Sequence, residues 1–522
     1  MAKRTQPVDE IPSPPTPEGT DRRWLVLAIL CTSLLLAGLD LTVLHVAVPS
    51  LSRDLQPSGP ALLWIVDVYS LTVAAFLVTC GSLADRLGRK RVVIAGFALF
   101  GLSSLAAAVA SSTAQLIAAR AVLGLGTALI MAATVAIIRN VFPDDRERAF
   151  AIGLWTAAHS VGTTLGPLVG GLIVEHFRWG AVFLINVPIV AVVLVAGARY
   201  IPESHNPEPR RWDVTSVVLS VIGLGGLVYG LKQLADPAGI TAASLVVGAA
   251  GAALLVWFVL RQQRIGHPLL DLSLFRNRRF TVAVLAVFGC FGSYVAMLFL
   301  LMQWFQQTGG YSPLQAGASL VPLAASNALG ATLAPWVTNR WGNRRAMTAA
   351  LVSFAVALVV FAAAGETSGY LLVAVLLVVA GFGAGIIMTA GADSITAAVS
   401  PQRAGEAAAI QETSFELSAG VGVAVLGSVL AVTYQLTLPP VPFLGSEDAT
   451  AVRESISSVP GVSGHLGPDQ VAALHALTTG AFDHGIRLAS FTAAAVLLLT
   501  ALLTVTLLRT SQPESAESAG GR

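Results

Sequence analysis

Residues 81–91 read GSLADRLGRKR and lie between two apolar runs, 64–84 and 92–110. Each run is long enough to cross the hydrocarbon core of a bilayer as a helix. Two glycines permit a tight turn between these helices, and four cations follow the single acid, Asp85. Because Lys and Arg are retained on the cytoplasmic side of membrane proteins, the turn is predicted to be cytoplasmic.

The composition of the whole chain indicates that lipid is its main solvent. Of the 522 residues, 55% are hydrophobic and 11% are charged, which is too few charges for a soluble domain. The net charge of +2 gives no reason to expect nucleic acid as a partner. The three cysteines lie inside apolar runs, so no disulfide framework is expected.

Signatures of catalysis are absent from the sequence. It contains no P-loop, so ATP is not expected as the energy source. No set of His, Cys and Asp residues has metal-ligand spacing, and no cofactor motif occurs. We therefore expect neither an enzyme nor a bound metal or cofactor.

Fourteen segments are apolar and long enough to span a bilayer, which predicts an all-α polytopic membrane protein. These segments are 24–50, 61–84, 92–111, 114–141, 147–175, 180–201, 211–233, 240–261, 280–306, 312–338, 346–365, 370–398, 404–434 and 484–509. Residues 1–23 and 510–522 are predicted to be disordered cytoplasmic tails, with no cleavable signal before the first span.

The positions of the cations support an even number of spans. Most of the 31 Lys and Arg residues fall in the tails and in alternate loops, which places both termini in the cytoplasm. Arg120 lies within a span. The cations on the other side are Arg53, Arg178, Lys232, Arg453 and Arg487.

Two polar linkers, 202–213 and 262–279, bracket spans 7 and 8 and leave six spans on either side. This predicts a first bundle at 24–201, two inserted helices at 211–262 and a second bundle at 276–509. A WGNRR sequence after span 10 mirrors the basic turn after span 2 and indicates that the two halves are related. The second bundle carries one long outer loop, 437–481, in which Val471–Leu477 could form a short amphipathic helix.

Several motifs resemble those of major facilitator superfamily transporters. Residues 81–91 resemble the loop between helices 2 and 3 of that superfamily, and Arg120–Ala128 matches R-x-x-x-G-x-G-x-A, although Ala132 stands where many members have Pro. Residues 162–171, GTTLGPLVGG, resemble the motif of span 5 that is associated with antiporters. Trp179 and the sequence FLINVP at 183–188 match the family's span 6.

With fourteen spans, the chain most resembles drug:proton antiporters of the QacA type, over about 24–510. The resemblance implies two six-helix bundles of the major facilitator fold plus two additional helices, with a substrate site near the midplane. It also implies efflux of lipophilic organic cations, such as quaternary ammonium compounds and dyes, in exchange for protons. We expect a monomer in the lipid bilayer of the inner membrane.

Asp40 and Arg120 are candidates for proton coupling. A carboxylate inside a span is costly and indicates function, and Asp40 lies about 15 Å and Arg120 about 9 Å from the outer surface. Their depths permit an ion pair, in which Asp40 would alternate between an ionised form beside Arg120 and a protonated form. A purely structural salt bridge is the alternative.

Three further acids are candidates for both proton coupling and substrate binding. Asp67 lies near the start of span 2, where it could instead cap the helix or face water. Glu412 and Glu416 are four residues apart, so they share one face of span 13 near the midplane. Two ionised glutamates this close would repel each other, so at least one is expected to hold a proton.

Aromatic rings inside spans suit a cationic substrate because ring faces attract organic cations. The predicted substrate contacts are Trp155, Tyr294 and Phe415, together with Asn327 at mid-depth in span 10. Because Arg120 should neutralise Asp40, only Asp67 is left to meet a second charge. Monovalent cations are therefore expected to be favoured over dications.

The predicted gating elements are the basic turn and the glycine face of span 5. The turn would clasp the two bundles together at the cytoplasmic side, and the glycines allow close approach of another helix while Pro167 bends the span. The predicted gating residues are Gly81, Asp85, Arg86, Gly88, Arg89, Gly162, Gly166, Pro167 and Gly170.

Two other functions fit parts of this pattern. One is a dedicated exporter of a single metabolite, antibiotic or lipid, which broad tolerance of dissimilar cations would exclude. The other is a receptor or scaffold on a transporter fold that transports nothing. The buried acids argue against a scaffold.

Overall fold

The computed structural model describes residues 20–204, 213–233, 241–266, 270–364, 369–399 and 404–507. Within these ranges the regular structure is entirely helical. Fourteen helical segments are long and apolar enough to cross a membrane, which confirms the predicted fold class. The predicted tails fall mostly outside the described residues, except that residues 20–23 form the first turn of α1.

Six spans form the first bundle. The bundle comprises α1 (Thr20–Leu55), α2 (Gly59–Leu87), α3 (Arg89–Ala108), α4 (Thr113–Val141), α5 (Asp145–His176) and the pair α6 (Ala181–Leu184) and α7 (Asn186–Tyr200). The inserted helices follow as α8 (Val214–Gln233) and α9 (Ala242–Gln262).

The second bundle repeats this plan after a short 3-10 helix, η1 (Leu272–Arg276). It comprises α10 (Arg278–Gln307), α11 (Pro313–Ser319), α12 (Val321–Trp341), α13 (Asn343–Ala364), α14 (Tyr370–Ala397), α15 (Ala404–Thr437) and α18 (Pro468–Leu507). Between α15 and α18 lies a small cap, residues 438–467, which contains α16 (Ser446–Glu454), η4 (Ile456–Ser458) and α17 (Val459–Ser463).

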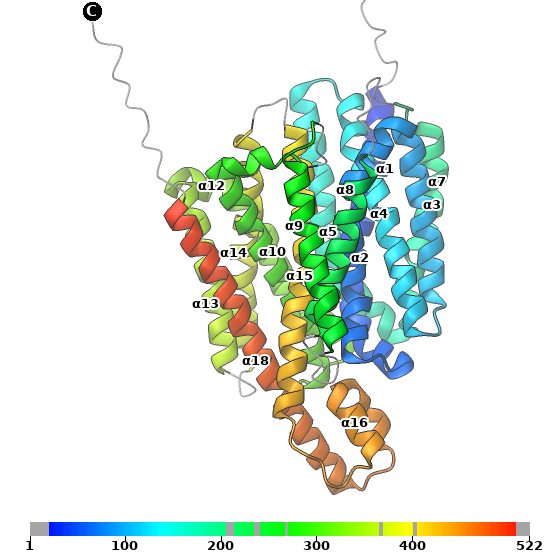
Figure 1. The fold of residues 1–522 in the computed structure, drawn as a ribbon, viewed down its shortest axis with the longest axis vertical. Coiled ribbons are helices and arrows are strands. Elements are labelled where there is room, and N and C mark those ends of the chain that lie inside the picture. The colour runs from blue at the N-terminus through cyan, green and yellow to red at the C-terminus, as the bar shows by residue number, and fades with distance from the viewer. Residues whose placement is uncertain are drawn as a thin grey trace, which may run out of the picture.

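The helices run side by side, and the cap projects from one end of the molecule (Figure 1). We call this the cap end, and we call the opposite end, which carries the α2–α3 turn, the basic end. α8 packs against α2 of the first bundle and α15 of the second, so the inserted helices lie beside the junction of the bundles.

Two predicted spans begin with a separate short helix. Span 6 divides into α6 and α7, and span 10 divides into α11 and α12. In each case a proline lies in the first turn of the second helix, Pro188 and Pro322. Proline lacks the N–H that would continue the preceding helix but suits the first turn of a new one.

The last helix begins inside the stretch predicted as the outer loop 437–481, before the predicted start of the last span at 484. α18 begins at Pro468, so the stretch Val471–Leu477 belongs to this long helix rather than to a separate short one. Pro468 followed by Asp469 is a favourable helix start. The helix therefore extends beyond the apolar run by which the span was located.

The cap is fixed to both bundles. Tyr434 donates a hydrogen bond to the carbonyl oxygen of Val452 at 2.8 Å, and Gln307 donates to Ser457 at 2.9 Å. η4 also packs against α1 of the first bundle. The cap thus contacts both bundles where they meet.

The bundles meet closely in their cap-end halves. The Gln306 side chain on α10 donates to the carbonyl oxygen of Val46 on α1 at 3.1 Å, and Glu175 on α5 accepts from the backbone N–H of Leu314 at 3.3 Å. Near the basic end, Gly81 and Gly153 face open space, with no atom within 4 Å of an added Cβ. The two bundles are therefore in direct contact in the half of the molecule next to the cap.

Candidate functional site

A buried ion pair joins α1 and α4 in the middle of the first bundle. Asp40 and Arg120 are completely buried, and Arg120 Nη1 lies 2.5 Å from Asp40 Oδ2. The structure thus brings together the two residues whose depths predicted a pair. Both charged groups are inaccessible to water. Protonation of Asp40 would therefore leave the guanidinium group of Arg120 without its counter-ion.

Two carbonyl groups of α2 also hold Arg120. Its Nε donates to the carbonyl oxygen of Ile65 at 3.1 Å and its Nη2 to that of Val66 at 3.0 Å. The guanidinium lies 4.9 Å from the ring centroid of Tyr69, a distance at which a cation is attracted to the ring face. Arg120 therefore connects Asp40 of α1 to the backbone of α2.

Asp40 has a second polar partner that the sequence analysis did not assign. Asn186 at the start of α7 donates through Nδ2 to Asp40 Oδ1 at 3.4 Å and to Ser104 Oγ on α3 at 3.3 Å. The sequence motif of span 6 includes Asn186, but nothing in that motif indicates which residue the amide would contact. The amide orients the carboxylate toward Arg120.

The carboxylate of Asp67 is not free to meet a second positive charge of a substrate, contrary to the prediction. It is completely buried, and its Oδ1 lies 2.7 Å from Nζ of Lys232, which is also completely buried. Lys232 belongs to the last turn of α8, rather than to an exposed outer loop. The pair forms because α8 docks against α2, which the sequence could not show.

Glu412 and Glu416 lie on α15, one turn apart, as their spacing predicted. Glu416 is 2% exposed and lies within hydrogen-bonding range of Ser70 on α2. Its other carboxylate oxygen, Oε2, is buried without a hydrogen-bond partner among the described residues. Glu412 is half-buried. A carboxylate of the second bundle thus reaches the first bundle one turn beyond Asp67.

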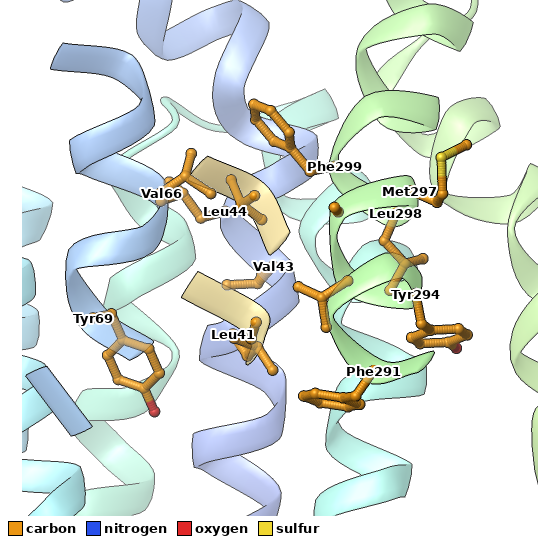
Figure 2. Close-up of a cluster of buried hydrophobic side chains, with 14 of the residues drawn as sticks. Leu41, Val43, Leu44, Val66, Tyr69, Phe291, Tyr294, Met297, Leu298 and Phe299 are labelled. Atoms are coloured by element: carbon orange, nitrogen blue, oxygen red, sulfur yellow. The ribbon is translucent and has the colours of Figure 1, made fainter. Parts of the chain in front are cut away.

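The central helices of the two bundles carry aromatic and apolar side chains close to these charges. Figure 2 shows α1 between Tyr69 of α2 and Phe291 of α10, with Leu41, Val43 and Leu44 on α1 itself. His45, one turn from Leu41, is buried against Phe299 with ring centroids 5.6 Å apart. Sequence reasoning gave His45 no role, although it lies five residues after Asp40 in the same span.

The predicted substrate contacts are dispersed. Phe415 on α15 is half-buried and meets Phe291 edge to face at 4.9 Å, close to the two glutamates in sequence. Trp155 on α5 is buried, and the ring of buried Tyr294 points away from α1 (Figure 2). Asn327 on α12 is half-buried and contacts the Met388 sulfur at 3.9 Å. Of these four, Phe415 is the one placed next to the buried acids.

Three contacts fix the basic turn within the first bundle, and the predicted clasp between the two bundles stays a prediction. Asp85 pairs with Arg89 at 3.0 Å, and Glu203 after α7 accepts from the backbone N–H of Lys90 at 3.2 Å. Gly88 has a φ of 103°, which favours glycine, and a Cβ there would lie 2.6 Å from Glu203 Oε1. These contacts fix the turn to the end of α7.

The glycine face of α5 packs against α1, also within the first bundle. A Cβ at Gly162 would overlap the Leu35 carbonyl oxygen, and one at Gly166 would overlap the Thr42 hydroxyl. At Gly170 it would lie 2.8 Å from the Val43 carbonyl oxygen. The predicted close helix approach is present, but it is not at the junction of the bundles.

A different edge of α5 meets the second bundle. The backbone at Pro167 touches Gly317 of α11 so closely that a Cβ on Gly317 would overlap the Pro167 carbonyl oxygen. A Cβ at Gly171 would lie 2.6 Å from the Pro313 carbonyl oxygen. Of the predicted gating residues in α5, Pro167 is thus the one at the bundle junction.

Comparisons with known proteins agree with this architecture. Residues 30–423 match the family model described as Major Facilitator Superfamily. The multidrug efflux pump LfrA of Mycolicibacterium smegmatis is 37% identical over 489 residues, covering 94% of this chain and 97% of LfrA. The methyl viologen resistance protein SmvA of Salmonella typhimurium is 34% identical over 484 residues, covering 92% and 97%.

Among solved structures, an inward-facing, occupied bacterial homolog of the human lysosomal transporter Spinster is similar to this chain, with a TM-score of 0.66. The match covers 94% of this chain and 97% of that structure at 16% sequence identity, and so supports the fold alone. Together with the family match and two relatives that align over nearly their whole lengths, it assigns the fold and the family. The chain belongs to the Major Facilitator Superfamily of membrane transporters.

Proposed function

We propose that this protein is a multidrug efflux antiporter that exports lipophilic organic cations in exchange for protons, by alternating access. The observation that carries the proposal is Glu416, a carboxylate buried where α15 of the second bundle meets α2 of the first. Its Oε2 has no hydrogen-bond partner among the described residues. An acid held at mid-membrane without a counter-charge is suited to bind a proton or a cation in turn.

Asp40 and Arg120 would supply the second half of the coupling. When a proton neutralises Asp40, Arg120 loses its counter-ion but remains bound to the carbonyl groups of Ile65 and Val66 on α2. The strength of the α1–α4 contact then depends on the protonation of Asp40, which provides differential contacts between two states of the bundle. Loss of the proton to the cytoplasm would restore the pair.

The cargo would enter from the basic end, which we place in the cytoplasm because Lys and Arg gather there. In this assignment, the direct contact of the two bundles near the cap corresponds to an inward-facing state. The half-buried Glu412 and the Phe415 ring would meet the cation first, and Glu416 would hold it. Relatives described as a multidrug efflux pump and a methyl viologen resistance protein support export of toxic organic molecules.

Uptake of a fluorescent monovalent cation into proteoliposomes tests this function. Uptake should be fast when the lumen is more acidic than the outside, because proton exit then drives cation entry through inverted molecules. Dissipating the gradient with a protonophore should reduce uptake to the level of protein-free vesicles. Uptake that ignores the pH gradient, or transport of a single neutral metabolite in place of varied cations, would contradict the proposal.

A further inference from the structure

The inserted helix α8 carries a lysine, Lys232, that lies at the junction of the two bundles. Lys232 near the end of α8 points to Asp67 of α2, with Nζ 2.7 Å from Oδ1, and its Nζ also lies 3.7 Å from the Trp64 ring centroid. Neither charged side chain is exposed. The ion pair and the ring together enclose the ammonium group.

The lysine is held in this position by packing along α8. Leu71 of α2, Val228 of α8 and Ala424 of α15 form a buried cluster, against which Leu224 and Leu417 also pack. Leu224, Val228 and Lys232 are spaced four residues apart, so they lie on one face of α8. This face touches both bundles and aims the lysine at α2.

The two inserted helices are themselves tightly joined, so α8 is a firm support. Gly230 approaches Gly248 of α9 closely enough that a Cβ would lie 2.5 Å from its Cα. At the basic end, Arg261 pairs with Asp213 at 2.8 Å. The lysine therefore belongs to a helix that is in contact with α9 near both of its ends.

Stability alone does not explain this ion pair. Burying two charges has a desolvation cost that often exceeds their attraction, and an apolar pair would pack as well. Asp67 lies one turn from Ser70, which contacts Glu416, and directly follows the two residues whose carbonyl groups hold Arg120. Without Lys232, Asp67 would be another acid beside the proposed cation site.

We propose that Lys232 is a specificity-determining residue: it is a resident cation that occupies Asp67 and excludes the second charge of a dicationic substrate from that carboxylate. This inference rests on the proposed function, because it assumes that organic cations are the cargo. It differs from a structural role in that it predicts a change in charge preference. Removal of the lysine should open the transporter to dications.

The test compares methyl viologen, a dication, with tetraphenylphosphonium, a monocation, in proteoliposomes with an imposed pH gradient. The ratio of their initial uptake rates should rise about tenfold in Lys232→Met, the scale of one added charge contact. Lys232→Arg, which keeps the cation, should retain the wild-type ratio. The Asp67→Asn/Lys232→Met double variant should return the ratio to that of wild type.

An unchanged ratio in Lys232→Met, or an equal rise in the double variant, would overturn the inference. A second measurement does not depend on whether Lys232→Met folds. In wild type Asp67 is already occupied, so the Asp67→Asn/Lys232→Met double variant, which leaves no buried charge without a partner, should keep the wild-type ratio of dication to monocation affinity in purified protein. A lower ratio would show that Asp67 meets the second charge. Failure of wild type to transport either cation would instead refute the proposed function.

Discussion

Asp40 is connected through short polar contacts to three other helices of its bundle. Arg120 belongs to α4 and also bonds to α2, while Asn186 joins Asp40 from α7. Each of these groups is completely buried, so water cannot replace a lost contact. On the proposed function, a single proton on Asp40 would alter the packing of several helices.

Replacing Asp40 by asparagine should abolish transport driven by a pH gradient. Asn cannot take up and release the proton, although it keeps the shape of the side chain and its contact with Asn186. Exchange of labelled for unlabelled cation without a gradient should continue, because cargo would bind on α15. Gradient-driven uptake at the wild-type rate would show that Asp40 does not couple protons.

Glu416→Gln should impair export of monovalent cations more than Asp67→Asn does. Glu416 has an unpartnered oxygen at the bundle junction, whereas Asp67 is already paired with Lys232. Because Asp67→Asn also leaves the buried ammonium group of Lys232 without its counter-ion, Asp67→Asn/Lys232→Met is measured beside it as a control. Initial rates normalised to the amount of folded protein decide the comparison, and a larger loss in Asp67→Asn would reverse the assignment.

The sequence predicted some of these residues because depth within a span follows from counting. Asp40 and Arg120 were expected to meet, and the i,i+4 spacing of Glu412 and Glu416 fixed their shared face. The partner of Asp67 could not be predicted, since it depends on how α8 docks against α2. Because Lys232 lies at the end of a span, it was counted with the cations of the outer loops. Its position directly after an apolar run could have indicated that it belongs to the helix.

At the scale of helices, α5 has two faces with different neighbours. Its glycine face packs against α1, and its edge at Pro167 and Gly171 packs against α11. A movement of α11 relative to this edge would leave the α1–α5 packing intact, because the two contacts lie on different faces of α5. Close backbone packing within one bundle is what allows that bundle to move as a unit.

Gly162→Ala should destabilise the first bundle by about 1–3 kcal/mol, because the new methyl group would overlap the backbone carbonyl of Leu35. Gly153→Ala on the same helix is the matched control, since its Cβ would meet no atom within 4 Å. The control should be neutral or slightly stabilising, as alanine favours a helix over glycine. Thermal unfolding in detergent measures both. Equal transition temperatures would contradict the packing described for α5.

Hydrophobic length identified the spans but not where helices begin, break or extend. The breaks before α7 and α12 are single-residue events at the start of apolar runs, so they barely change the hydropathy of a segment. α18 begins well before its apolar run because Pro468 and Asp469 start a helix irrespective of lipid. Local helix chemistry, rather than the bilayer, sets these boundaries.

The whole molecule has one basic end and one capped end, and this asymmetry predicts its orientation. An Arg91→Cys variant in the strongly exposed part of the α2–α3 turn should react with a membrane-impermeant maleimide only after the cells are opened. Ser446→Cys in the cap should react in intact cells. Reaction of the two positions in the opposite pattern would invert the orientation.

Proton movement driven by cargo tests the central claim most directly, because it measures coupling rather than drug uptake. Wild-type proteoliposomes with a pH-sensitive dye inside would receive an inward gradient of tetraphenylphosphonium at equal internal and external pH, with the membrane potential clamped. We expect the lumen to become alkaline as protons leave in exchange for the entering cation, and Asp40→Asn vesicles to show no such change. A constant luminal pH during wild-type cation uptake would contradict proton antiport.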